Sequence, residues 1–190
     1  MLKYQPCFSA FLNETNIQRC ILPDTPDRDR LVAYLIAQSQ RMANSKYHTC
    51  IFSHKGLTDF ATHGYIGDFP VSGSVCLGIA DRLQMLRKLY YHCKYDTMFL
   101  RLANPVIFPF PEDLCITIED EVCLTFSSPS LQPTPWKQMQ TTERTLLEAF
   151  DDFYVYLMDS QLIYSKEETL REVDSFINLL SQKINTTHIS

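Results

Sequence analysis

The chain has 190 residues, of which 45% are hydrophobic, 12% aromatic and 21% charged. This composition excludes collagen-like, low-complexity and disordered proteins, because those chains lack the apolar surface that offsets conformational entropy. Lysine and arginine total 17 against 22 acidic residues, for a net charge of −5. We therefore expect no direct binding to nucleic acid, which depends on basic side chains.

The N-terminus has no basic segment followed by a long apolar run, so we expect neither a signal peptide nor a membrane segment. Seven cysteines are present, and none form a C-x-x-C pair of the kind found in zinc and redox sites. Most lie among apolar neighbours, where a free thiol behaves as a small hydrophobic group. The pattern is typical of a reducing compartment, and the predicted location is cytoplasmic.

Residues 1–23 show no clear periodicity, and we predict an N-terminal arm that docks on the core with one short strand. Four apolar side chains are expected to make this contact: Phe8, Phe11, Ile17 and Ile21. The first clear helix is predicted over residues 26–44, because Asp24 and Thr25 can cap it and Pro26 suits its first turn.

A β-branched and aromatic run predicts a strand over residues 47–53, ended by His54, Lys55 and Gly56. A short helix over residues 57–63 follows, and Gly64 suits the left-handed position after a helix. Apolar spacing predicts a helix over residues 80–94 and a second strand over residues 98–103.

Two alternating segments, residues 114–118 and 122–126, predict a hairpin. A turn centred on Asp120 would place Ile118 opposite Val122 and Ile116 opposite Leu124. The two strands would then share an apolar face. Their other face, of cysteine and threonine, is only mildly polar, so we expect another element to cover it. A further short strand is predicted over residues 136–140.

Two long helices complete the chain. The first is started by Thr141 and Thr142 and has no glycine or proline over residues 143–160, and the second is opened by the capping box of Ser165 and Glu168. We therefore predict an α+β fold in which residues 24–190 form a single domain after the arm of residues 1–23. The domain is expected to contain a mixed β-sheet of about four to five strands with an antiparallel hairpin, packed by four to five helices.

The candidate ligand-binding residues are His54, Lys55 and Asp59, which fall where a strand gives way to a helix. Ligands gather at the carboxyl ends of strands in open sheets, and a helix start offers backbone N–H groups to an anion. A histidine, a lysine and an acid could bind and attack a phosphate. The alternative is that Lys55 and Asp59 form an exposed ion pair one helical turn apart and His54 is a turn residue.

These residues loosely resemble the H-x-K-x-x-x-x-D signature of phospholipase-D-like phosphodiesterases. In this chain His54 and Lys55 are adjacent, Asp59 follows Lys55 by four positions rather than five, and a second copy of the motif is lacking. Such an enzyme would need a second basic or histidine group facing His54, and His92 is the candidate on a predicted helix. The spacing of His48, His63 and His92 predicts no metal site, and we expect no cofactor.

Tyrosine and phenylalanine are abundant, at 10 and 12 residues. Several lie on predicted helices in positions beyond a single stripe, among them Tyr90, Tyr91, Phe153, Tyr154 and Tyr156. Such residues either fill a large monomeric core or cover an interface with a partner or a second copy. Both alternatives remain open at this point, and a homodimer is the expected assembly.

Two segments, Ser53–Phe60 and Asp81–Arg87, resemble the C-terminal effector halves of some bacterial helix-turn-helix transcriptional regulators, over roughly residues 25–180. The resemblance implies a non-enzymatic sensing or interaction domain that binds a small ligand or a protein partner. The DNA-binding region of such a regulator would lie upstream or in a partner protein, because residues 1–23 are too short to contain it. The alternative function is a degenerate phosphodiesterase using His54 and Lys55, and a structural accessory protein is a third class.

Overall fold

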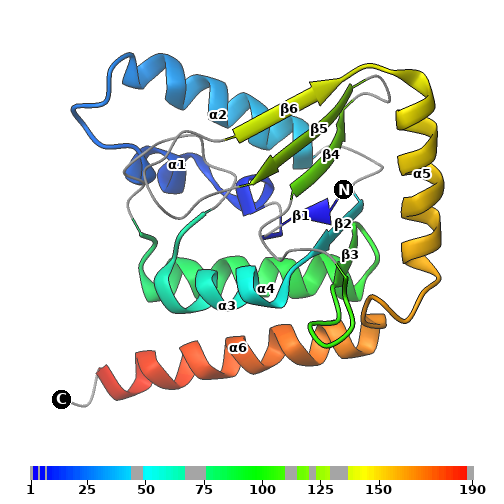
Figure 1. The fold of residues 1–190 in the computed structure, drawn as a ribbon. Helices are drawn as coiled ribbons and strands as arrows, with labels where there is room; N and C mark the ends of the chain where they lie inside the picture. The colour runs from blue at the N-terminus through cyan, green and yellow to red at the C-terminus, as the bar shows by residue number, and fades with distance from the viewer. Residues whose placement is uncertain are drawn as a thin grey trace.

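The computed structural model describes residues 2–3, 5–6, 8–43, 49–66, 76–109, 115–119, 123–128 and 137–187. Its strands follow the order β3-β2-β1-β4-β5-β6 (Figure 1). They comprise β1 (Leu2–Lys3), β2 (Thr49–Phe52), β3 (Phe99–Leu102), β4 (Cys115–Glu119), β5 (Cys123–Ser128) and β6 (Lys137–Thr141). The α+β class predicted from the sequence is confirmed.

The expected extent of the mixed sheet, four to five strands, was wrong, because six described strands follow one order. The described strands form a parallel pair, β2 with β3, and an antiparallel group, β4 to β6. The two-residue strand β1 is the connection, because it pairs in parallel with β2 and through Leu2 with β4. A two-residue strand gives almost no periodic signal, so the sequence did not reveal how the two halves join.

Six α-helices are present in the described part of the chain, one more than the upper end of the prediction. They are α1 (Glu14–Cys20), α2 (Arg28–Ala43), α3 (His54–His63), α4 (Ile79–Lys94), α5 (Arg144–Met158) and α6 (Lys166–Thr187), with a 3-10 helix η1 (Phe8–Phe11) before them. The sequence prediction missed α1 and η1. Helix α1 is only two turns long and begins with an asparagine capping box, Asn13 with Asn16, which is an uncommon form of that motif.

The N-terminal arm nevertheless supplies core side chains, as predicted. Phe8, Phe11, Ile17 and Ile21 are all buried within the larger apolar cluster of the protein. Phe8 stacks on Phe60 of α3, with ring centroids 3.7 Å apart. The arm therefore contributes to the same core as the helices that follow it.

Two predicted helix starts were displaced. Helix α2 begins at Arg28 rather than Pro26, because Asp27 adopts a left-handed backbone with φ of 52° and its carbonyl accepts the first helical hydrogen bond, from Leu31. Helix α3 begins at His54, three residues before its predicted start, because Ser53 caps it by accepting a hydrogen bond from the Gly56 N–H. Gly64 ends α3 with φ of 79°, which confirms the prediction for that residue.

The hairpin of β4 and β5 is confirmed, but its register lies two residues from the predicted one. Ile118 is opposite Leu124 and Ile116 is opposite Phe126. A shift of two residues keeps every side chain on its predicted face, because strand side chains alternate with a period of two. Cys115 and Thr125, on the mildly polar face, are buried as expected.

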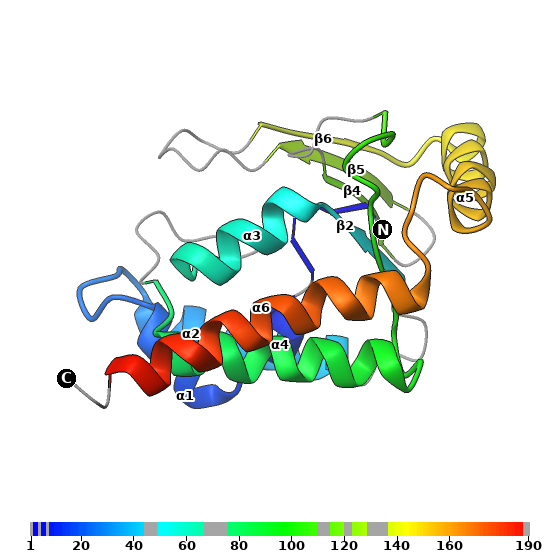
Figure 2. The same cartoon turned by 90° about the horizontal axis from the view of Figure 1, so that it is seen from below.

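The two faces of the sheet pack against unequal cores. One face packs with α2, α3, α4 and α6 in the larger cluster, to which the strands contribute Cys50, Phe52, Leu100 and Leu102. Figure 2 shows these helices together on one side of the strands. The opposite face contributes a smaller cluster that is covered mainly by α5, which stands apart at one end of the sheet. The buried members of this second cluster are Ile51, Ala103, Ile116, Leu124, Leu157 and Ile163.

Candidate functional site

The candidate residues His54 and Lys55 occupy the first turn of α3, directly after β2 ends at Phe52. Ser53 lies between the strand and the helix, and its hydroxyl accepts a hydrogen bond from the Gly56 N–H at 2.9 Å. The backbone N–H groups of this first turn lie at the positive end of the helix dipole. The sequence was therefore right to place these residues at a strand-to-helix junction.

Lys55 and Asp59 contact each other. The Lys55 Nζ lies 2.8 Å from the Asp59 Oδ2, one helical turn away, and the lysine side chain is half-exposed. This is the ion pair that the sequence offered as the alternative to a phosphate site. A pair of this kind at the protein surface contributes little to stability, because solvent screens it.

His54 points instead to α6. Its Nε2 lies 3.4 Å from the Glu172 Oε2, and its ring centroid lies 6.2 Å from that of Phe176. Its Nδ1 lies 3.4 Å from the Thr58 hydroxyl. Glu172 is a residue that the sequence analysis missed, and no local spacing could have linked it to His54, because the two meet only when α3 and α6 pack together.

His92 does not complete a phosphodiesterase site among the described residues. Its ring stacks on Phe11 of η1 with centroids 5.2 Å apart, and its Nδ1 lies 2.7 Å from the Thr97 hydroxyl. Burial and the nearby Lys88 lower the pKa of His92, so its ring favours the neutral form. His63 lies at the other end of α3 from His54, and His48 lies outside the described residues.

Within the described part of the chain, His, Cys, Asp and Glu form no group of three that could hold a metal ion. No helix in the same residues combines the length and the apolar character needed to cross a bilayer.

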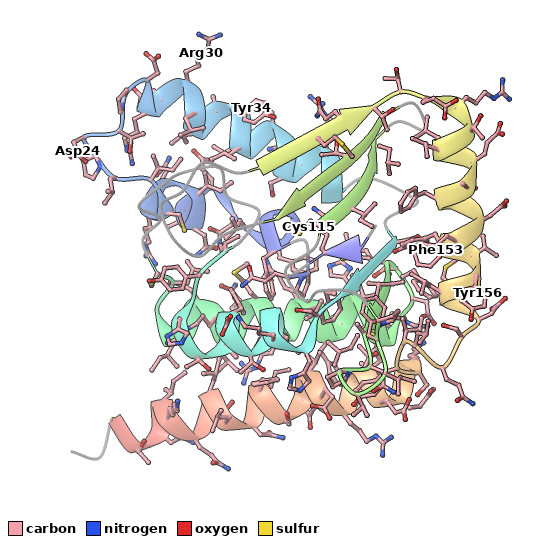
Figure 3. All side chains as sticks on the ribbon, in the orientation of Figure 1. Asp24, Arg30, Tyr34, Cys115, Phe153 and Tyr156 are labelled. Carbon is pink, nitrogen blue, oxygen red and sulfur yellow. The ribbon has the colours of Figure 1, made fainter. Side chains whose placement is uncertain are left out.

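A second candidate site is the outer side of α5. We define the α5 surface as Val155 and Tyr156 with the exposed acids around them. These two residues are 51% and 61% exposed. In Figure 3, Phe153 lies on the side of α5 that faces the sheet and Tyr156 lies toward solvent.

The inner side of α5 is also incompletely covered. Leu157 is its one fully buried residue among those described. Leu147, Phe150, Phe153 and Tyr154 pack against the smaller cluster but remain partly exposed. The aromatic residues predicted to extend beyond one stripe therefore do so on α5, and part of their area is open to solvent.

The charge on α5 is strongly negative. The helix and its two caps carry the acids Glu143, Glu148, Asp151, Asp152 and Asp159 against one base, Arg144. Arg144 is held by Glu148, with its Nε 2.8 Å from the Glu148 Oε1. The last turn has no basic residue, and Asp159 adds its charge where the helix dipole is already negative.

Comparison of the chain with protein-family models, with curated proteins and with solved structures finds no match to any of them.

Proposed function

We propose that this chain is a non-enzymatic interaction domain that binds a protein partner through the α5 surface. The observation that supports this proposal is the exposure of Val155 and Tyr156 on a helix whose inner apolar side is itself half-covered. Exposed aromatic and aliphatic side chains grouped on one element are typical of protein–protein contacts. An effector domain of a transcriptional regulator, the class that the sequence resembles, acts through such contacts.

The charge of α5 indicates the chemistry of the partner. Asp152 and Asp159 flank the exposed apolar residues, and the helix dipole adds negative potential at the same end. A partner segment with an apolar face and neighbouring lysine or arginine side chains would bury Val155 and Tyr156 and neutralise these acids. We therefore propose a basic amphipathic helix as the occupant of the α5 surface.

The contacts of His54 and Lys55 favour this function over a phosphodiesterase. The Lys55 ammonium group is engaged by Asp59, and His54 contacts a carboxylate on α6 rather than a second histidine. The His54–Glu172 contact joins α3 to α6, whereas the Lys55–Asp59 pair lies within α3, and neither contact requires a substrate. The ligand-binding role of His54, Lys55 and Asp59 stays a prediction.

The proposal can be tested with a synthetic amphipathic helix that has a leucine face and a lysine face, added to the full isotope-labelled chain. We expect NMR chemical-shift changes centred on Val155 and Tyr156, and binding that weakens as salt is added. The Tyr156→Ser variant should bind about tenfold more weakly, because aromatic anchors dominate such contacts. The matched control is Tyr34→Ser on α2, where the tyrosine is 58% exposed, and this variant should bind as the wild type does.

A second peptide, with glutamate in place of every lysine, completes the test. It should not bind, because its charges repel those of α5. Equal binding of the two peptides, or shift changes centred away from α5, would contradict the proposed function.

A further inference from the structure

The exposed side of α4 carries two bases and two tyrosines. Arg87, Tyr91, Lys94 and Tyr95 are exposed and follow each other at positions i, i+4, i+7 and i+8, which places them on one face of the helix and its C-cap. We call these four residues the α4 stripe. Tyr91 and Tyr95 are 55% and 58% exposed, so the stripe offers aromatic area to a partner.

Ring contacts hold the tyrosines and Lys94 together. The ring centroids of Tyr91 and Tyr95 lie 4.7 Å apart. The Lys94 Nζ lies 5.7 Å from the Tyr95 centroid and 5.9 Å from that of Tyr90, within the range of a cation–π interaction. The charge of the lysine is therefore kept beside the exposed aromatic rings.

The positive charge of the α4 stripe is not neutralised by its neighbours. Among the described residues, neither Arg87 nor Lys94 lies within ion-pair distance of a carboxylate. The next acid along the chain, Asp96, pairs instead with Arg101, at 3.9 Å between Oδ1 and Nη2, and with Lys166. The stripe therefore favours a partner surface that carries acids.

The α5 surface has the complementary character. Asp152, Val155 and Asp159 follow each other at i, i+3 and i+7 and are exposed on one face of α5 and its C-cap, with Tyr156 next to Val155. Neither aspartate forms an ion pair within the described part of the chain. Contact between two α5 surfaces would oppose acids, and contact between two α4 stripes would oppose bases. An α4 stripe against an α5 surface brings opposite charges together.

The positions of the two surfaces allow this contact to form twice between two copies. Figure 2 shows the last turn of α4 and the whole of α5 towards the same end of the molecule. A two-fold axis at that end would place each α4 stripe against the α5 surface of the other copy, and the interface would be self-complementary. The net charge of −5 on each copy opposes association only weakly, because salt screens charges more than about 8 Å apart at physiological ionic strength.

We propose that the α5 surface binds the α4 stripe of a second copy of this chain, in a two-fold dimer with two such contacts. The inference rests on the proposed function, because it names the basic helix that occupies the α5 surface. The exposed tyrosines of the two surfaces would be buried in each contact. The bases of the α4 stripe would neutralise the acids of α5.

The test is a charge exchange in the full chain, followed by sedimentation. The wild type should sediment as a dimer that dissociates as salt is added. Lys94→Glu and Asp152→Lys should each raise the dissociation constant about tenfold or more, because each substitution opposes like charges in both contacts. An equimolar mixture of the two variants should associate as the wild type does. One contact of that heterodimer has both charges exchanged, and the other has the wild-type charges.

Arg30→Glu is the matched control, because Figure 3 shows Arg30 on α2, at the other side of the molecule from Tyr156. This variant should remain a dimer, and circular dichroism should show the same helix content in all four proteins. A monomeric wild type, a single variant that dimerises as the wild type does, or a mixture that does not associate would each overturn the inference.

The leucine–lysine helix separates this inference from the proposed function. It should dissociate the wild-type dimer, and it should bind Lys94→Glu at least as tightly as the wild type, because that variant leaves α5 unoccupied. A monomeric wild type that still bound the helix would overturn the dimer and leave the proposed function intact. A monomeric wild type that bound a single-stranded oligonucleotide through Lys94 would also overturn the dimer, because exposed aromatic rings beside bases can stack on nucleotides.

Discussion

Arg82 joins α4 to the end of α3. Its Nη1 donates hydrogen bonds to the carbonyls of Ala61 and Thr62, both at 2.7 Å, at the end of a helix where carbonyls lack partners within the helix. Burial lowers the pKa of the guanidinium group, which stays charged because an arginine side chain does not lose its proton in proteins. The side chain thus places a positive charge at the negative end of the α3 dipole.

Replacement of Arg82 should therefore destabilise the protein. We expect Arg82→Leu to lower the free energy of unfolding by about 1–3 kcal/mol, the range for losing hydrogen bonds to a charged group. Urea unfolding followed by circular dichroism measures this change. Arg87→Leu, at an exposed position on the same helix, should change stability by no more than about 0.5 kcal/mol. Equal effects of the two substitutions would show that Arg82 acts only as a surface charge.

His92 makes stability depend on pH. Because burial and then Lys88 lower its pKa in the folded protein, the unfolded chain binds a proton on this ring more readily than the folded protein does. The ring is neutral in both states above the unfolded pKa of about 6.5, so it has no effect there. As pH falls below that value, stability should decrease until the folded ring is protonated as well.

The contribution of His92 can be isolated by substitution. His92→Gln should flatten the loss of stability below about pH 6.5, measured as the urea midpoint at a series of pH values. His63→Gln should keep the wild-type slope, because His92 is still present. An unchanged slope in His92→Gln would contradict the assignment.

At the scale of elements, a single hydroxyl connects α6 to the β3 edge. Thr169 is fully buried on α6, and its Oγ1 accepts a hydrogen bond from the Leu102 N–H. Thr169→Val keeps the shape of the side chain but leaves that buried N–H without its acceptor. We expect a loss of about 1–3 kcal/mol in the free energy of unfolding, measured by urea titration.

Thr186 provides the comparison for this substitution. It lies at the exposed end of the same helix, where its hydroxyl bonds to the Gln182 and Lys183 carbonyls of its own turn. Thr186→Val should cost no more than about 0.5 kcal/mol. If Thr169→Val cost as little, the β3 edge would not depend on the hydroxyl.

The elements that the sequence predicted well are those with local signals. Ser165 and Glu168 form the predicted capping box, with reciprocal hydrogen bonds of 2.8 and 3.2 Å. Gly64 adopts the predicted left-handed conformation, where an added Cβ would lie 2.5 Å from the Leu77 carbonyl oxygen. Each of these signals depends on residues within one helical turn, so the sequence carries them directly.

The features that escaped prediction are set by tertiary contacts. Glu172 reaches His54 only through the packing of α3 against α6. The hairpin register depended on turn length, which alternation alone does not determine, since a shift of two residues leaves both faces unchanged. The sequence thus placed His54 and Lys55 at the junction of a strand and a helix, while the partners of their side chains could not be predicted from it.

For the molecule as a whole, the two cores predict two levels of stability. The larger cluster holds α4 and α6 through fully buried side chains such as Leu86, Leu89, Val173 and Leu180. Helix α5 is held by Leu157 and by side chains that remain partly exposed. Segments with little buried apolar area open locally at a lower free-energy cost than the global unfolding transition. We therefore expect the amide protons of α5 to exchange with solvent before those of α4 and α6.

Native-state hydrogen exchange with two variants tests this division. Leu157→Ala should accelerate exchange in α5 while leaving the protection of α4 unchanged. Leu86→Ala, in the larger cluster, should lower the global free energy of unfolding by about 2–5 kcal/mol and accelerate exchange everywhere. Exchange of α5 only together with α4, at the same free energy, would mean that the two cores unfold as one unit. A helix that opens independently could rearrange as a partner binds, without loss of the sheet that carries it.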